Sequence, residues 1–147
     1  MRKRANELLD RLHQLGSELD LSFSSQQLLR NGVMGLDGIR RHLLVVTETG
    51  KGDYDWEVMA LNAIESCSVK KTYRTIHANA LKGRGLDDYL ECILLRFELA
   101  GGRKPVEVPF YRSGENDPEE MPALEQRVRN WQVMLSKMLS GKVKQYA

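Results

Sequence analysis

Apolar residues recur every three or four positions near both ends of the chain, whereas the middle alternates over short runs. The C-terminal pattern predicts a helix from about Pro118 to Ser140, with Asp117 as its cap and Gly141 as its stop. Glu119 and Glu120 place negative charge at the positive end of the helix dipole. The predicted apolar face consists of Met121, Leu124, Val128, Trp131, Leu135, Met138 and Leu139.

A second amphipathic helix is predicted near the N-terminus, from Arg2 to about Leu15. Gly16 and Ser17 then interrupt the pattern, so we expect the helix to end there. Its apolar face consists of Leu8, Leu9, Leu12 and Leu15.

Between these helices the alternation of apolar and polar residues is typical of short strands separated by turns. The segment 21–31 fits either a short helix or an irregular strand, and we favour a strand. Pro109 predicts that the last strand lies at an edge or contains a bulge, because proline cannot donate to a strand ladder. Seven strands are predicted, at about 21–31, 33–36, 42–48, 56–61, 64–73, 89–99 and 106–111.

Mostly short connections favour an antiparallel meander, so the predicted fold class is α+β. The strands should curl into a barrel or an orthogonal sandwich, with the C-terminal helix capping it. We expect the core to contain Trp131, Leu135, Val128, Phe97, Leu95 and Phe110.

This order of elements, ending in a helix that carries a Trp, resembles the pleckstrin-homology-like superfold over about Leu21 to Leu139. We therefore expect two parts: the N-terminal amphipathic helix at 1–20, and one pleckstrin-homology-like domain at 21–147, which is what the resemblance implies. It rests on topology and a Trp-bearing helix, without a diagnostic motif.

The chain also resembles uncharacterised bacterial proteins that carry such a domain behind a single N-terminal membrane anchor. Arg2, Lys3 and Arg4 lie at an uncapped helix start, where positive charge is disfavoured. They are either a solvated tail or the cytoplasmic flank of an upstream membrane helix of about 20 apolar residues. The second interpretation places the protein at the cytoplasmic face of a membrane; the first makes it cytoplasmic.

A short N-terminal helix is marginal alone, so its leucines should pack on the strands or on a second copy. They could cover the side of the sixth strand that carries Leu90, Cys92 and Leu94.

Composition fits one globular domain: 147 residues, 41% hydrophobic and 29% charged. A net charge of +2 and sparse aromatic residues beside basic ones give no reason to expect nucleic acid as a partner. Cys67 and Cys92 have no motif around them, so we expect buried free thiols rather than a bridge.

The sequence contains no arrangement typical of catalysis. His13, His42 and His77 fall in different predicted elements, and none pairs with a cysteine or carboxylate at metal-ligand spacing. No nucleophile elbow, dinucleotide loop or phosphate-binding loop is present in the sequence. We therefore expect the protein to be non-catalytic and to bind neither a metal ion nor a cofactor.

One region concentrates positive charge, because no acidic residue lies between Ser66 and Leu86. Such a region can bind phosphates or anionic lipid head groups, although it is also typical of a solvated strand end and loop. The candidate anion-binding residues are Lys70, Lys71, Arg74, Lys82 and Arg84.

Two functions follow. The favoured one is a non-catalytic binding or scaffolding module that uses an exposed strand edge or barrel face for a protein partner. The alternative is an anion or phospholipid head-group binder that acts at a membrane surface through the basic 70–84 region.

Overall fold

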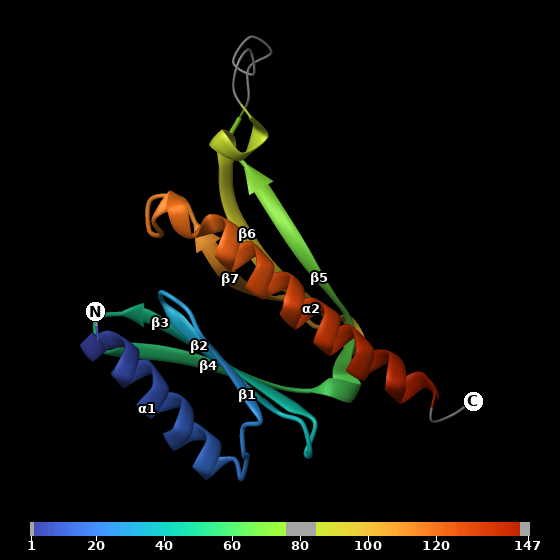
Figure 1. The fold of residues 1–147 in the computed structure, drawn as a ribbon. Helices are drawn as coiled ribbons and strands as arrows, with labels where there is room; N and C mark the ends of the chain where they lie inside the picture. The colour runs from blue at the N-terminus through green and yellow to red at the C-terminus, as the bar shows by residue number, and fades with distance from the viewer. Residues whose placement is uncertain (1, 76–84, 145–147) are drawn as a thin grey trace. The chain divides into compact units, whose positions relative to one another are not determined.

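The computed structural model describes residues 2–75 and 85–144, with the side chains of 5–75 and 85–139. The chain divides into two compact units, residues 1–64 and 65–147. Each unit contains one antiparallel sheet and one long helix (Figure 1). The predicted α+β class, with a C-terminal and an N-terminal helix, is therefore confirmed.

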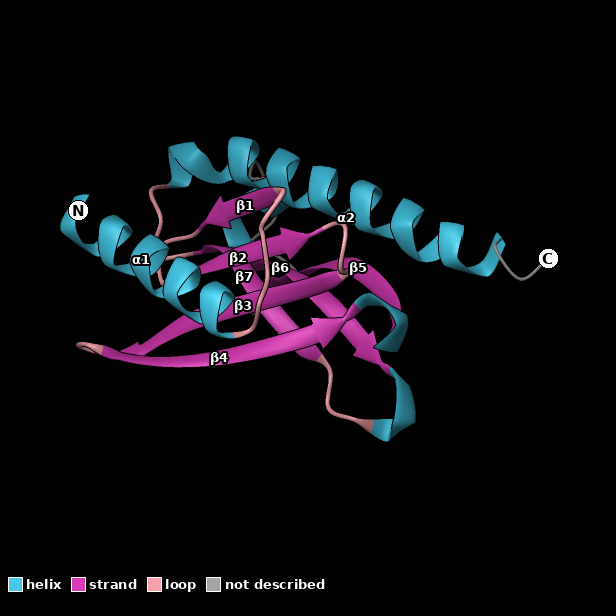
Figure 2. Ribbon diagram, turned by 90° about the horizontal axis from the view of Figure 1, so that it is seen from below, coloured by secondary structure: helices cyan, strands magenta, loops and turns pink. Residues whose placement is uncertain are grey.

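The first unit consists of helix α1 and a sheet in the order β1-β2-β3-β4. Figure 2 shows these four strands side by side, with β4 at one margin. The elements are α1 (Arg2–Glu18), β1 (Ser25–Leu28), β2 (Gly32–Asp37), β3 (His42–Gly50) and β4 (Asp53–Ala60). The ambiguous segment 21–31 thus contains a strand, as expected.

The second unit consists of a sheet in the order β5-β6-β7 and helix α2, which packs on β6 and β7. The elements are β5 (Ile64–Tyr73), β6 (Leu90–Leu99), β7 (Val106–Arg112) and α2 (Met121–Lys144). Short 3₁₀ turns lie at Leu61–Ala63, Leu86–Tyr89, Ala100–Gly102 and Pro118–Glu120. In the described part of the chain the seven strands form two antiparallel sheets and no closed barrel. Of the two predicted alternatives, a barrel or an orthogonal sandwich, the barrel was therefore wrong.

Helix α1 does not stop at Gly16, because it continues to Glu18. A Cβ atom at Gly16 would lie 2.6 Å from Cε2 of Phe23, and one at Gly35 of β2 would lie 2.7 Å from its Cδ1. The Phe23 ring therefore fits between helix and sheet only because both positions lack a side chain. This glycine serves close packing, whereas the sequence suggested a helix stop.

The apolar face of α1 packs on the first sheet, so the expectation that it packs on strands is confirmed. The suggestion that it covers Leu90, Cys92 and Leu94 of the sixth strand was wrong, because its buried leucines share a core with β2 and β3. The buried core of this unit consists of Leu8, Leu12, Leu15, Val33, Leu44 and Val46. Leu9, Leu19, Leu21, Phe23, Tyr54 and Val58 are partly buried against it. Burial of this shared apolar surface stabilises the position of the helix on the strands.

The second unit confirms the predicted C-terminal helix and its start. The Asp117 carboxylate accepts a hydrogen bond from the Glu119 amide at 3.0 Å, while the Glu120 carboxylate accepts one from the Asp117 amide at 3.1 Å. The predicted stop at Gly141 is wrong, since α2 extends to Lys144. The six predicted core residues are all buried, namely Trp131, Leu135, Val128, Phe97, Leu95 and Phe110.

Pro109 lies where the sequence predicted a disturbed edge. Strand β7 is an edge of its sheet, and its register with β6 shifts between the pairs Leu94–Pro109 and Ile93–Tyr111. Phe110 is therefore the extra residue of a bulge. The bulge and the proline together protect this edge from pairing with another chain.

Candidate functional site

The predicted anion-binding residues do not form one open cluster in the described part of the chain. Lys70 and Lys71 are neighbours on β5, so their side chains point to opposite faces of the sheet. The Lys71 ammonium lies 2.9 Å from the Glu125 carboxylate of α2. The hydrogen bond from Lys71, helped by Arg129, lowers the pKa of Glu125.

Arg74 is also engaged within the molecule. Its guanidinium donates a hydrogen bond to the Asp88 carbonyl and lies 5.8 Å from the centre of the Tyr89 ring. Lys82 and Arg84 lie outside the described residues. The anion-binding site stays a prediction, and two of its three described members, Lys71 and Arg74, already have intramolecular partners.

The described histidines have structural partners. His13 hydrogen-bonds the Gln26 side chain at 3.1 Å and stacks on Phe23. His42 Nδ1 lies 2.8 Å from the Arg40 carbonyl oxygen. His77 lies outside the described residues. Within the described ranges, no group of three or more His, Cys, Asp or Glu residues is placed to hold a metal ion.

Both cysteines are free and buried, as expected. Burial raises the pKa of Cys67 to about 12, and it also raises the pKa of Cys92. A thiol with a raised pKa stays protonated at neutral pH, so it is a poor nucleophile. These positions are core residues.

Asp37 is the one buried charged side chain among the described residues, with 1% of its surface exposed. Its carboxylate accepts hydrogen bonds from the amides of Ser22, Ile39 and Arg40 at 2.8 to 3.0 Å. The Arg40 guanidinium lies 3.3 Å from it. These bonds, led by the Arg40 and Ser22 amides, lower the pKa of Asp37 to about 2. Asp37 therefore fixes the turn after β2 to the segment that precedes β1.

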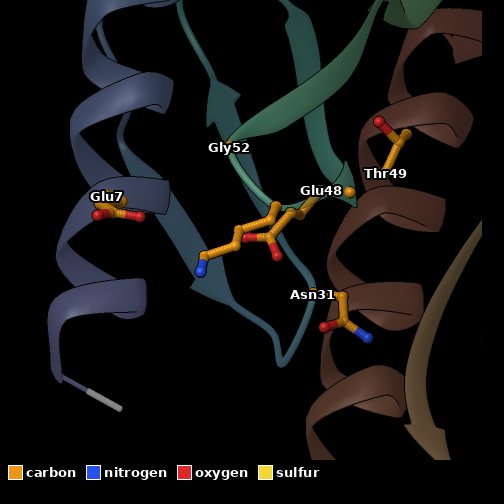
Figure 3. A pocket seen from close by; sticks show the side chains of 7 residues that line it. Glu7, Asn31, Glu48, Thr49 and Gly52 are labelled. Carbon is orange, nitrogen blue, oxygen red and sulfur yellow. The ribbon is translucent and has the colours of Figure 1, made fainter.

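A polar hollow of about 590 Å³ lies at the β3–β4 turn (Figure 3). Figure 3 shows Glu7 on α1, Glu48 near the middle and Asn31 on the connection between β1 and β2. The hollow is lined by Glu7, Asn31, Glu48, Thr49, Gly50, Lys51 and Gly52. Its lining contains two acidic residues, Glu7 and Glu48, and no histidine or cysteine, so it offers too few ligands for a metal-binding group of three.

The best candidate for an interaction site is the outer edge of β4. This strand is the last in its sheet, and its eight residues contain no proline. Every second residue of such a strand directs its N–H and C=O groups away from the sheet, where another strand can pair with them.

Trp56 of β4 is the last member of a row of apolar residues that crosses the sheet, one from each strand. We call it the apolar row; its members are Leu28, Val33, Val46 and Trp56. These residues lie opposite one another across β1, β2, β3 and β4. Val33 and Val46 are fully buried under α1, whereas Trp56 remains 48% exposed. The helix therefore covers the middle of the row and leaves a large aromatic side chain accessible at the edge.

The sequence contained a signal for this strand that the predicted boundaries missed. The run Asp53 to Val58 alternates acidic residues with Tyr54, Trp56 and Val58, which is the period of a strand with two different faces. The prediction began at Trp56, so it excluded half of that pattern. That β4 lies at an edge depends on strand order, which the pattern of one segment does not determine.

Comparison with known proteins adds no relative: no protein-family model, curated protein sequence or solved structure matches this chain. None of the described helices is long and apolar enough to cross a bilayer.

Proposed function

We propose that this chain is a non-catalytic binding module that takes up an extended segment of a partner protein along the outer edge of β4. The supporting observation is an edge strand that contains no proline, pairs with no described strand on its outer side within its own unit, and carries a half-exposed Trp56. Strand addition gains affinity from main-chain hydrogen bonds, while contacts of alternate side chains select the sequence.

The geometry of β4 suits this role. Trp56 is rigid and large, and aromatic anchors of this kind dominate binding energy at interfaces. Its cross-strand neighbour Val46 is fully buried, so Trp56 lies directly beside the core of the first unit. An added strand would pair with the backbone of β4 and cover the exposed part of the indole.

The pleckstrin-homology-like resemblance is part of the proposal. Seven antiparallel strands followed by a helix with a buried Trp131 support it. The anion-binding alternative takes second place, because Lys71 and Arg74 would have to give up intramolecular contacts to bind a phosphate.

The test is a peptide selection that needs no known partner. A random twelve-residue library displayed on phage is panned on the full chain and, in parallel, on the Trp56→Ala variant. We expect the enriched peptides to bind the variant about tenfold more weakly or worse, because truncation of an aromatic hot spot has effects of this size. Their binding should shift the backbone amide signals of residues 53–60 in NMR spectra.

Val133→Ala is the matched control, because Val133 is 53% exposed and belongs to α2 of the second unit, not to strand β4. This variant should bind the selected peptides as tightly as the wild type does. The proposal is wrong if no peptide is enriched, or if the enriched peptides shift amides elsewhere and bind the Trp56→Ala variant normally.

A further inference from the structure

We infer that the segment bound at β4 is basic, with lysine or arginine at alternate positions and apolar residues between them. This inference rests on the proposed function and adds the chemistry of the partner. It follows from the two faces of β4, which differ in charge.

The register of the β3–β4 pair assigns these faces. Trp56 lies opposite Val46, which packs under α1, so Trp56 is on the helix-covered face. Tyr54 and Val58, two residues away on either side, share that face and pack partly against the same core. The intervening residues Asp53, Asp55 and Glu57 therefore form an acidic row on the other face.

The acidic row has no counterion in the described part of the chain. All three side chains are exposed, and no hydrogen bond or ion pair joins them to another described residue. Their cross-strand neighbours on β3 are Gly50, Thr47 and Val45, none of which is charged. Alternate residues of a strand lie roughly 7 Å apart, which is within the screening length at physiological salt, so the three carboxylates repel one another.

A second copy of this chain is a poor occupant for the edge. Two β4 strands paired antiparallel across a two-fold axis perpendicular to the sheet would present the same face on the same side. The acidic row of one copy would then lie beside the acidic row of the other. Like charges on opposed strands are destabilising, whereas opposite charges are stabilising, so the row favours a basic partner over self-pairing.

The helix-covered face requires a different side chain from the same partner. The Arg11 guanidinium lies over the Tyr54 ring, 5.0 Å from its centre. The Tyr54 ring therefore already makes a cation–π contact within the chain. Trp56 keeps its exposed surface and offers an apolar contact. A strand added to β4 alternates its side chains in the same way, with cations beside the acidic row and apolar groups beside Trp56.

Synthetic peptides test the inference directly. Three eight-residue peptides carry valine at every second position, with lysine, threonine or glutamate between the valines. Binding to the full chain is followed by NMR through the amides of residues 53–60, at low and moderate salt. We expect the lysine peptide to bind about tenfold more tightly than the threonine peptide at low salt, because three cross-strand charge pairs act together. The advantage should shrink as salt screens the charges, and the glutamate peptide should bind most weakly.

The Asp55→Asn/Glu57→Gln variant is the matched control, because both changes remove charge and preserve side-chain shape. It should lose the preference for lysine and keep its affinity for the threonine peptide. Equal binding of the lysine and threonine peptides at β4 would overturn the inference and leave the proposed function standing, with the acidic row acting only to discourage aggregation at the edge. The absence of any shift in residues 53–60 with all three peptides would overturn both. Dimerisation of the chain through β4, detected by sedimentation, would also overturn the inference.

Discussion

The two edges of the first sheet are built in opposite ways. Strand β1 has four residues, and the chain before it is fixed by the Phe23 ring and by the bonds to Asp37. Strand β4 has eight residues, and neither a proline nor a cover from the described part of its own unit protects its outer edge. Proteins usually protect exposed edge strands from pairing with other chains, as the proline and bulge of β7 do in the other sheet. An edge that is long and carries a half-exposed Trp56 therefore calls for a functional explanation.

The largest effect on stability is expected at the β1 edge, where Phe23 packs against Gly35. Gly35→Ala inserts a methyl group 2.7 Å from Cδ1 of Phe23, so either the Phe23 ring or the backbone of β2 must shift. We expect a loss of about 1 to 3 kcal/mol in the free energy of unfolding, measured by urea denaturation. In a Phe23→Ala background the same change should cost much less, because the clash has been removed.

Gly85→Ala is the control for this cycle. A Cβ atom there would meet nothing within 4 Å, and the φ angle of −78° suits alanine. This variant should be neutral or slightly more stable. Equal costs of Gly35→Ala with and without Phe23 would show that the ring is not what fixes β1.

A smaller effect, dependent on pH, is expected at Asp37. Its pKa in the folded chain is lowered from the ordinary 3.8 to about 2, so the charged form stabilises the fold. This contribution is fully present above pH 4 and disappears as pH falls towards 2, since the folded carboxyl then becomes protonated. Asp37→Asn should be less stable than the wild type at pH 7, and the difference should narrow between pH 4 and 2. Urea denaturation at several pH values measures it.

Asp20→Asn is the matched control for Asp37. The Asp20 side chain is 94% exposed, lies 3.9 Å from the Arg40 guanidinium, and asparagine tolerates its φ of 58°. We expect this change to have little effect at any pH. A stability difference for Asp37→Asn that stays constant from pH 7 to 2 would contradict the role of the charge.

The smallest effect on stability is expected at the open edge. Asp55→Asn should change the free energy of unfolding by no more than about 0.5 kcal/mol, because the carboxylate is exposed and has no partner among the described residues. Thermal or urea unfolding would measure it. A large loss of stability would mean that the acidic row supports the fold, and the contrast between the two edges would then disappear.

The sequence predicted much of this architecture because its signals are local. The capping residue Asp117 and the disturbance at Pro109 each depend on neighbouring residues, and each was confirmed. The end of α1 was missed because the reason for Gly16 is the ring of Phe23, seven residues further along the chain. Helix propensity alone gives no information about such a contact.

The candidate site was less predictable for a related reason. The basic residues are conspicuous in the sequence, yet Lys71 meets Glu125 only because β5 and α2 come together. Conversely, Trp56 looked like an ordinary strand residue, and its exposure follows from the order of four strands and the path of α1. Pairing between distant segments determines which side chains remain accessible, and periodicity does not encode it.

The core shared by α1 and the first sheet also determines which truncations and which protease cleavages the folded chain can tolerate. Val33, Leu44 and Val46 are fully buried against Leu8 and Leu12. A shortened chain beginning at Leu21, the boundary suggested by the family resemblance, would expose that sheet face to water. Protease digestion of the intact chain should therefore spare the link between α1 and β1, and deletion of residues 1–20 would produce a protein prone to aggregation. The N-terminal helix supplies half of the buried residues of this core, so its removal would leave the first sheet without the partner on which it packs.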